Sequence, residues 1–185
     1  LKSRINAYQA GHRDFVAWVM GLLGPVNDKV VLDIGCGVGT FLSELEQAGA
    51  RNILGIDANP GMIEEAKKEC PRATLFEQDM DAPWKISQPV DKAMAIYSAY
   101  YSNNVPGLVE KVHNVLTTGG TLVVVGPSPR ASWDVVEHRN AGLPIPELRG
   151  VDKAAEIVSA VASAFGSARR PPWRLRRPAW ASRSN

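Results

Sequence analysis

Three glycines at alternate positions, Gly35, Gly37 and Gly39, constrain the fold of this chain more than any other feature. Residues 30–34 before them are branched and apolar except for one acid, and residues 41–45 after them carry apolar side chains at helical spacing. This order predicts a buried strand, a loop almost without side chains, and a helix start. Glycines let a ligand approach the backbone closely, and the first N–H groups of a helix have no partner within it. The stretch therefore indicates a site for a nucleotide-like cofactor, although a plain tight turn would also use glycines.

Short apolar strands alternate with amphipathic helices along most of the chain. We expect strands at 29–34, 51–57, 73–76, 93–97 and 122–125, and helices at 6–23, 40–48, 59–70 and 105–117. The alternation is typical of α/β proteins with a Rossmann-like, mostly parallel sheet and helices on both faces. Ligands of such sheets bind beyond the carboxyl ends of the strands. The three glycines, Asp57, Asp79 and residues 97–101 all follow strands, so we expect them to lie along one rim.

The chain of 185 residues divides into three predicted segments. Residues 1–28 form an N-terminal helical segment that we expect to act as a lid over a substrate, and residues 29–165 form the Rossmann-like domain, with further helices at 131–139 and 152–165. Residues 166–185 are rich in Arg, Pro and Trp, lack periodicity, and are expected to be disordered. This tail holds six arginines and no acids, which leaves the rest of the chain mildly acidic. Nucleic acid is therefore not the expected partner, and an RNA-contacting tail is the weaker alternative.

Only two cysteines, Cys36 and Cys70, are present, and they give neither a disulfide framework nor a metal-ligand spacing. Cys36 suits the glycine loop because a small residue is needed there. The chain has no apolar run of membrane length and no signal-peptide core at its start. We therefore expect a cytoplasmic protein that binds no metal and does not contact the membrane, with an N-terminus trimmed of its initial Met.

Five stretches in order resemble the motifs of class I S-adenosylmethionine-dependent methyltransferases. They are Val31 to Thr40, Asp57 after the second strand, Asp79-Met80 after the third, Asp91 with the strand to Tyr97, and the turn at 116–122, where Thr118 replaces the commoner proline. The resemblance covers residues 5–128. It implies that the chain binds S-adenosyl-L-methionine and releases S-adenosyl-L-homocysteine.

The resemblance also implies a set of cofactor-binding residues. The set is Asp33, Gly35, Cys36, Gly37, Gly39, Asp57, Ala58, Met62, Asp79, Met80 and Tyr97. A carboxylate at Asp57 can accept from both ribose hydroxyls, as it does in dinucleotide enzymes, and Asp79 is placed to accept from the adenine amino group. Met80, Ala58 and Met62 would contact the adenine, whereas Asp33, the Gly35 carbonyl and Tyr97 would lie at the methionine end. Each acid could instead be a helix cap or a solvated loop carboxylate.

No residue is compelling as a catalytic base. Methyl transfer is an in-line displacement at a carbon already activated by the sulfonium, so alignment and water exclusion are the main tasks of the protein. The weak candidates are Tyr100, Tyr101, His12 and His138, with Asn103 and Asn104 as further acceptor contacts and Pro127-Ser128 as part of the pocket floor. The Asn/Asp-Pro-Pro-aromatic sequence of methyltransferases that act on nucleic-acid amines is absent, since residues 97–100 read Tyr-Ser-Ala-Tyr. A small molecule is therefore the expected acceptor, through an O, N or C atom.

Two alternatives remain. An NAD-dependent dehydrogenase would carry Gly-x-Gly-x-x-Gly rather than the Gly-x-Gly-x-Gly at 35–39. An incomplete or non-catalytic methyltransferase-like protein is the second alternative, because residues 166–185 cannot supply the two C-terminal antiparallel strands of a complete class I sheet. We therefore expect those strands to be missing or truncated, and an exposed sheet edge would favour a homodimer.

Overall fold

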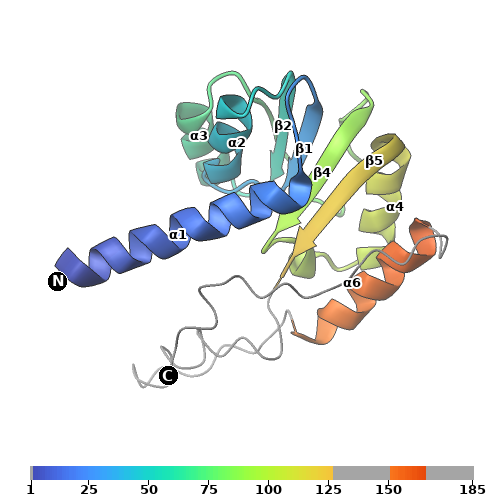
Figure 1. Cartoon of the computed structure of the whole chain (residues 1–185). Coiled ribbons are helices and arrows are strands. Elements are labelled where there is room, and N and C mark those ends of the chain that lie inside the picture. Colours follow the sequence, from blue (N-terminus) through green and yellow to red (C-terminus); the bar gives the residue numbers. More distant parts are fainter. Residues whose placement is uncertain (1, 127–150, 166–185) are drawn as a thin grey trace.

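The computed structural model describes residues 2–126 and 151–165, and within them a sheet carries helices on both faces (Figure 1). The strands are β1 (Val30–Ile34), β2 (Asn52–Asp57), β3 (Thr74–Glu77), β4 (Val90–Ile96) and β5 (Leu116–Val125). The helices are α1 (Lys2–Leu23), α2 (Thr40–Gln47), α3 (Pro60–Glu69), α4 (Val105–Val115), α6 (Val151–Ala164) and the short 3-10 helix η1 (Ala99–Tyr101). The strand order is β3-β2-β1-β4-β5, and every neighbouring pair is parallel. The Rossmann-like α/β sheet predicted from the sequence is confirmed.

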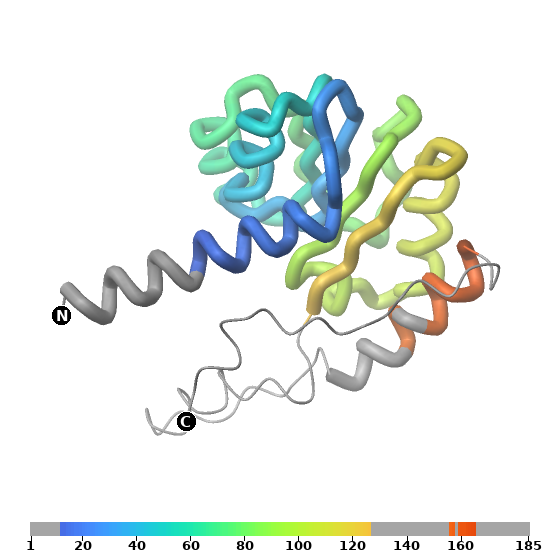
Figure 2. Tube along the Cα trace, viewed as in Figure 1, coloured from blue at the N-terminus to red at the C-terminus, as the bar shows by residue number. Residues whose placement is uncertain are grey.

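The chain reverses its direction across the sheet between β1 and β4. It runs outward from β1 through β2 to β3, then returns and continues on the other side with β4 and β5. Figure 2 shows this as the blue strand β1 lying between the cyan strand β2 and the yellow-green strand β4. Such a switch point leaves a crevice beyond the carboxyl ends of the two central strands. The glycine loop that follows β1 lies at this point.

Side chains of β1 alternate between two apolar clusters, one on each face of the sheet. Val31 packs with residues of α1, α2 and α3, whereas Val30 and Leu32 pack with residues of α4 and α6. Successive side chains of a strand point to opposite faces, so Asp33 shares the face of Val31. An acid is thus placed on the face that α1 and α2 cover, at the one position of β1 that is not aliphatic.

Two asparagines, each with a proline one or two positions later, begin helices, as the sequence predicts at Asn59. The Asn59 Oδ1 accepts from the backbone N–H of Gly61 at 2.9 Å, and the Asn104 Oδ1 accepts from that of Gly107 at 3.0 Å. At the other end of a helix, the Lys92 ammonium donates to the carbonyl oxygen of Leu23, the last residue of α1. These caps define where α3 and α4 begin and where α1 ends.

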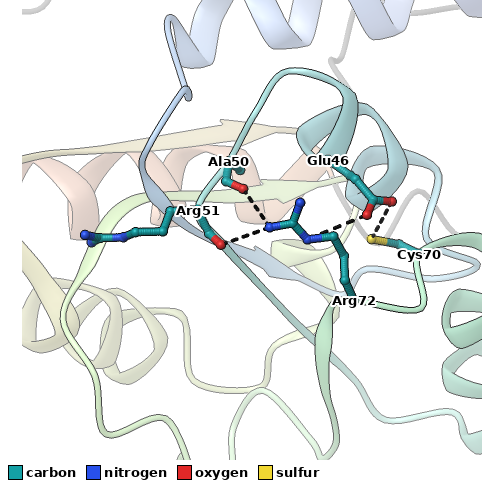
Figure 3. Close-up of polar contacts among 5 residues, drawn as sticks. All are labelled: Glu46, Ala50, Arg51, Cys70 and Arg72. Atoms are coloured by element: carbon teal, nitrogen blue, oxygen red, sulfur yellow. Dashed lines mark hydrogen bonds and ion pairs between the residues drawn. The ribbon is translucent and has the colours of Figure 1, made fainter.

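Arg72, just after α3, fastens α3 to the start of β2 and to α2 (Figure 3). Its Nη2 donates to the carbonyl oxygens of Ala50 at 3.3 Å and Arg51 at 3.1 Å, and its Nε lies 3.6 Å from the Glu46 carboxylate. The same carboxylate accepts from the thiol of Cys70 at 3.6 Å. Burial, followed by the nearby charge of Glu46, raises the pKa of that thiol. Cys70 is therefore a packed, hydrogen-bonded residue, and Cys36 is likewise free and buried.

The boundaries around β5 differ from the prediction. Helix α4 ends at Val115 rather than near residue 117, and β5 begins directly at Leu116 rather than at residue 122. Gly119 and Gly120 therefore lie inside the strand segment, where Gly119 has a φ of +79°. Strand β4 likewise begins earlier than predicted, at Val90, and ends before Tyr97. In both cases strand pairing with a neighbour extends the strand beyond its most apolar residues.

Several predictions fall outside the described residues. They concern the helix at 131–139, Pro127-Ser128, His138, the antiparallel strands and the tail at 166–185. The helix predicted at 152–165 is observed as α6, and that predicted at 6–23 is observed as α1 with an earlier start. Among the helices that the structure describes, none combines the length and the apolar character needed to cross a membrane.

Candidate functional site

The glycine loop is held tightly against β2. The backbone N–H groups of Gly35 and Cys36 both donate to the carbonyl oxygen of Ile56, at 2.8 Å and 3.0 Å, and the N–H of Gly39 donates to the Cys36 carbonyl at 3.0 Å. The three glycines have positive φ angles of +73°, +53° and +90°, which L-residues with side chains rarely adopt. The loop conformation therefore depends on the glycines themselves.

The three glycines meet different surroundings. A Cβ on Gly35 would lie 2.4 Å from the Cβ of Ser98, and one on Gly39 would lie 3.0 Å from the Cα of Ala66. A Cβ on Gly37 would meet no atom within 4 Å. Packing within the protein therefore requires Gly35 and Gly39, whereas Gly37 leaves room for a ligand at the tip of the loop.

A pocket of about 220 Å³ lies beside this loop. Its lining comprises Asp33, Gly35, Cys36, Gly37 and Val38 around the loop, His12, Phe15 and Val16 of α1, Thr40 and Phe41 of α2, and Ile96 of β4. The pocket is thus shared between the glycine loop on one side and the N-terminal helix on the other. The pocket brings together only part of the predicted site. Its lining does not include seven of the predicted residues, namely Gly39, Asp57, Ala58, Met62, Asp79, Met80 and Tyr97.

Asp33 is the polar side chain in the pocket lining that is most deeply buried, with 2% of its surface exposed. Its Oδ2 accepts no hydrogen bond from any residue that the structure describes. Burial, and then the negative charge of Asp57, raise the pKa of Asp33 from 3.8 to about 7. A buried acceptor without a donor is rare in native proteins, and a cationic ligand group in the pocket would satisfy it.

Asp57 at the end of β2 connects the glycine loop to α3. Its Oδ2 accepts from the backbone N–H of Gly37 and its Oδ1 accepts from that of Asn59, both at 2.9 Å. A carboxylate offers about four lone-pair positions, so two remain for hydroxyl groups of a ligand. Asp57 is therefore not a helix cap, because Asn59 caps α3, but it holds the backbone on both sides of the loop in a way that is compatible with ligand binding.

The end of β3 also reaches the glycine loop. The terminal carbon of Met80 lies 3.8 Å from the position that a Cβ on Gly35 would occupy. Asp79 is exposed, and its Oδ1 accepts from the backbone N–H of Asp81 at 2.8 Å. Ala58 and Met62 are exposed near the start of α3, with 39% of the Met62 surface accessible. These residues lie at the same rim of the sheet as the loop, as the strand-end argument predicts.

Aromatic residues connect α1 to the strand ends. The ring of Phe15 lies 5.8 Å from that of Tyr97 and 6.3 Å from that of Phe41, measured between centroids. Tyr97 has a φ of +53° and is 48% exposed, so it projects from the turn after β4. Tyr100 and Tyr101 of η1 contact each other with their ring centroids 4.5 Å apart and their planes tilted by 41°.

Sequence analysis missed Phe15 and Phe41 as site residues. Both stand in apolar helical patterns, which do not distinguish a core position from a pocket wall. Asp91, which belongs to the fourth motif, accepts at its Oδ2 from the backbone N–H of Val30 at 2.9 Å. Asp91 is the second residue of β4 and Val30 is the first of β1, so this bond ties the two strands together at their amino ends, opposite the site.

The fold and the site together define a class of protein. A parallel sheet has a glycine loop at its switch point, acids at or after the ends of the next two strands, and one buried carboxylate oxygen without a partner among the described residues. These features are typical of α/β domains that bind nucleoside-containing ligands. Residues 31–120 match the family model described as a methyltransferase domain. The match supports a class I S-adenosylmethionine-dependent methyltransferase domain over these residues, as the sequence motifs predict.

Individual relatives agree with this assignment. Aklanonic acid methyltransferase DauC of Streptomyces sp. (strain C5) is 34% identical over 114 residues, which cover 58% of this chain and 52% of that protein. Trans-aconitate 2-methyltransferase of Escherichia coli (strain SE11) is 33% identical over 102 residues, which cover 55% and 40%. The crystal structure of an S-adenosylmethionine-dependent methyltransferase from Mesorhizobium loti superimposes with a TM-score of 0.55 at 27% identity, covering 58% of this chain and 51% of that one. The chain spans about half the length of the curated relatives that it matches.

Proposed function

We propose that this protein transfers the methyl group of S-adenosyl-L-methionine to an O, N or C atom of a small molecule. The observation that carries the proposal is the unpartnered, buried Oδ2 of Asp33 in a pocket beside the glycine loop. An amino acid ammonium is a donor of the required charge. A nicotinamide dinucleotide carries no ammonium, so the dehydrogenase alternative would offer Asp33 no charged donor of this kind.

Different residues of the rim bind different parts of the cofactor. When bound, S-adenosyl-L-methionine supplies a methyl group on a positively charged sulfur. Asp33 and the Gly35 carbonyl hold the ammonium, Asp57 accepts from the ribose hydroxyls, and Asp79 accepts from the adenine amino group. Met80 packs against the adenine. The open space at Gly37 admits the ligand to the loop, and the small, buried Cys36 keeps the loop close to β2.

The chain's contribution to the reaction is alignment and exclusion of water. Phe15 and Phe41 line the pocket together with Asp33, and Tyr97 contacts Phe15 from outside the lining. The two phenylalanine rings would lower the local dielectric and exclude water. His12 lines the same pocket, and the other histidine candidate, His138, lies outside the described residues. A nucleophilic acceptor would need no base.

The acceptor is proposed to enter between α1 and the segment after β4. Residues 1–28 then act as the lid, residues 29–165 as the cofactor domain, and Tyr100 and Tyr101 as acceptor contacts. The named relatives act on aklanonic acid and trans-aconitate, which are small molecules with carboxyl groups. Two free, buried cysteines agree with a reducing cytoplasmic setting, and a homodimer remains the expected assembly.

Isothermal calorimetry on the whole chain tests the proposal. We expect S-adenosylhomocysteine to bind with a 1:1 stoichiometry and NADH to show no binding heat. Incubation with S-adenosylmethionine and a panel of small carboxylic and phenolic acceptors should then release S-adenosylhomocysteine. Binding of NADH instead would overturn the assignment, and cofactor binding without turnover across a broad panel would favour the non-catalytic alternative.

A further inference from the structure

Asp81 stands between two loops that come from different strands. Its backbone N–H donates to the Asp79 Oδ1 at 2.8 Å, within the loop after β3. Its carboxylate accepts from the Ser102 hydroxyl at 2.5 Å and from the backbone N–H of Asn103 at 2.6 Å, in the segment after η1. One residue therefore links the acid assigned to adenine with the segment that follows the two tyrosines.

The second half of the link is equally specific. Ser102 is fully buried, and its Oγ also accepts from the backbone N–H of Asn104 at 3.0 Å, next to the start of α4. Burial alone would raise the pKa of Asp81, but the hydrogen bonds from Ser102 and Asn103 and the charge of Lys111 outweigh it and lower the pKa. Asp81 is therefore a charged acceptor at neutral pH, and hydrogen bonds to charged groups are the stronger kind.

Lys111 of α4 closes the same loop from the other side. Its ammonium donates to the carbonyl oxygens of Met80 and of Ala82, the latter at 3.0 Å, and it lies 5.6 Å from the centroid of the Trp84 ring. The Trp84 indole N–H donates to the Met80 carbonyl as well, at 3.0 Å. The backbone of the loop at 80–82 is thus anchored to α4, and this makes it a firm connection between Asp79 and Asp81.

We infer that Asp81 is a positioning residue that couples occupancy of the adenine site to the conformation of residues 100–104, on the acceptor side of the pocket. The inference rests on the proposed function, which places adenine at Asp79 and the acceptor near Tyr100 and Tyr101. When Asp79 engages a ligand, its bond to the Asp81 N–H is adjusted, and the Asp81 carboxylate carries the change to Ser102 and Asn103. Coupling of this kind is reciprocal, so an ordered acceptor segment would also favour cofactor binding.

Amide hydrogen exchange of the whole chain, with and without S-adenosylhomocysteine, tests the coupling. In the unmodified protein, the ligand should slow exchange at Gly37 and Asn59, beside the ribose site, and also at Asn103 and Asn104 by about fivefold or more. In Asp81→Asn at saturating ligand, exchange should still be slowed at Gly37 and Asn59. The slowing of exchange at Asn103 and Asn104 should disappear.

Two further variants separate coupling from loss of structure. Ser102→Ala should reduce the slowing at 103 and 104 in the same direction, whereas Glu110→Gln, an exposed acid one residue from Lys111, should leave it unchanged. If the ligand still slows amide exchange at Asn103 and Asn104 in Asp81→Asn, Asp81 has only a structural role and the inference is overturned, even if the melting temperature of the variant is lower. If the ligand slows exchange in the unmodified protein only at Gly37 and Asn59, the inference is also overturned, but the proposed function stands. No binding of S-adenosylhomocysteine at all would overturn both.

Discussion

Asp33 and Asp57 stand on the neighbouring strands β1 and β2, and the charge of Asp57 adds to burial in raising the pKa of Asp33 to about 7. The folded protein therefore binds a proton at Asp33 more tightly than the unfolded chain, whose carboxyl has its ordinary value of 3.8. The stabilising contribution is complete below about pH 4 and is lost as the pH rises through 7. At neutral pH, Asp33 thus costs stability unless a cation neutralises it.

Asp33→Asn should make the protein more stable at pH 8 and leave its stability at pH 4 nearly unchanged. The amide has no charge to bury, so the variant lacks the loss of stability that the carboxylate suffers between these pH values. The same variant should bind S-adenosylhomocysteine at least about tenfold more weakly, because a charge-assisted bond to the ammonium is gone. Urea denaturation at both pH values and calorimetry measure the two effects. If the unmodified protein and Asp33→Asn had equal free energies of unfolding at pH 8, Asp33 would not be the destabilising buried charge that is described above.

Gly35→Ala and Gly37→Ala should separate folding from binding. The alanine at 35 meets Ser98 at 2.4 Å in addition to its unfavourable φ, so we expect a loss of about 3 kcal/mol or more. The alanine at 37 carries only the strain of a left-handed conformation, about 1–2 kcal/mol. Its methyl group nevertheless fills space at the tip of the loop, and affinity for S-adenosylhomocysteine should fall about tenfold or more.

Chemical denaturation and calorimetry on the same preparations distinguish the two glycine variants. The variant Gly37→Ser is a second test of the space at the loop tip. If Gly37→Ala binds S-adenosylhomocysteine with unchanged affinity, the ligand does not occupy the loop tip.

Asp57→Ala should weaken S-adenosylhomocysteine binding by at least about tenfold, since bonds to a charged acceptor contribute about 1.5–3 kcal/mol. It should also lower stability, because Gly37 and Asn59 lose their backbone acceptor. Glu77→Ala is the matched control: Glu77 is the exposed partner of Asp57 in the register of β2 and β3. Calorimetry measures both variants, and an unchanged affinity in Asp57→Ala would refute the site.

Arg72→Ala should destabilise the protein by about 1–2 kcal/mol, mostly through its two bonds to backbone carbonyls. The ion pair with Glu46 is partly exposed, so Glu46→Gln should cost less than about 1 kcal/mol. Urea denaturation at low and high salt checks this division. If the loss of stability in Arg72→Ala depended strongly on salt, the ion pair with Glu46 would be the larger contribution.

Local sequence patterns were enough to predict the sheet and much of the rim. Local physical chemistry explains three of the predicted features, and tertiary contacts do not change them. These are the glycines after β1, Asp57 at the end of β2 and Asn59-Pro60 at the start of α3. The ends of strands were less predictable, because Leu116 and Val90 join the sheet through pairing with each other. Nothing in the chain around either residue reveals that pairing.

Long-range contacts account for the parts of the site that the sequence did not disclose. Phe15 joins Phe41 and Tyr97 across large separations in the chain, and its helical pattern would be the same in a plain core. The link from Asp81 to Ser102 spans two loops, and an acid after a strand reads locally as a solvated residue. Both relationships depend on the neighbours that folding supplies.

The two walls of the pocket come from different stretches of the chain. Asp33 and the glycine loop lie within the matched residues 31–120, whereas His12 and Phe15 precede them on α1. Substitutions on α1 would therefore change one wall of the pocket and leave the loop unaltered. If the loop binds the cofactor as proposed, proteins built on this plan could change their acceptor preference while keeping the same cofactor.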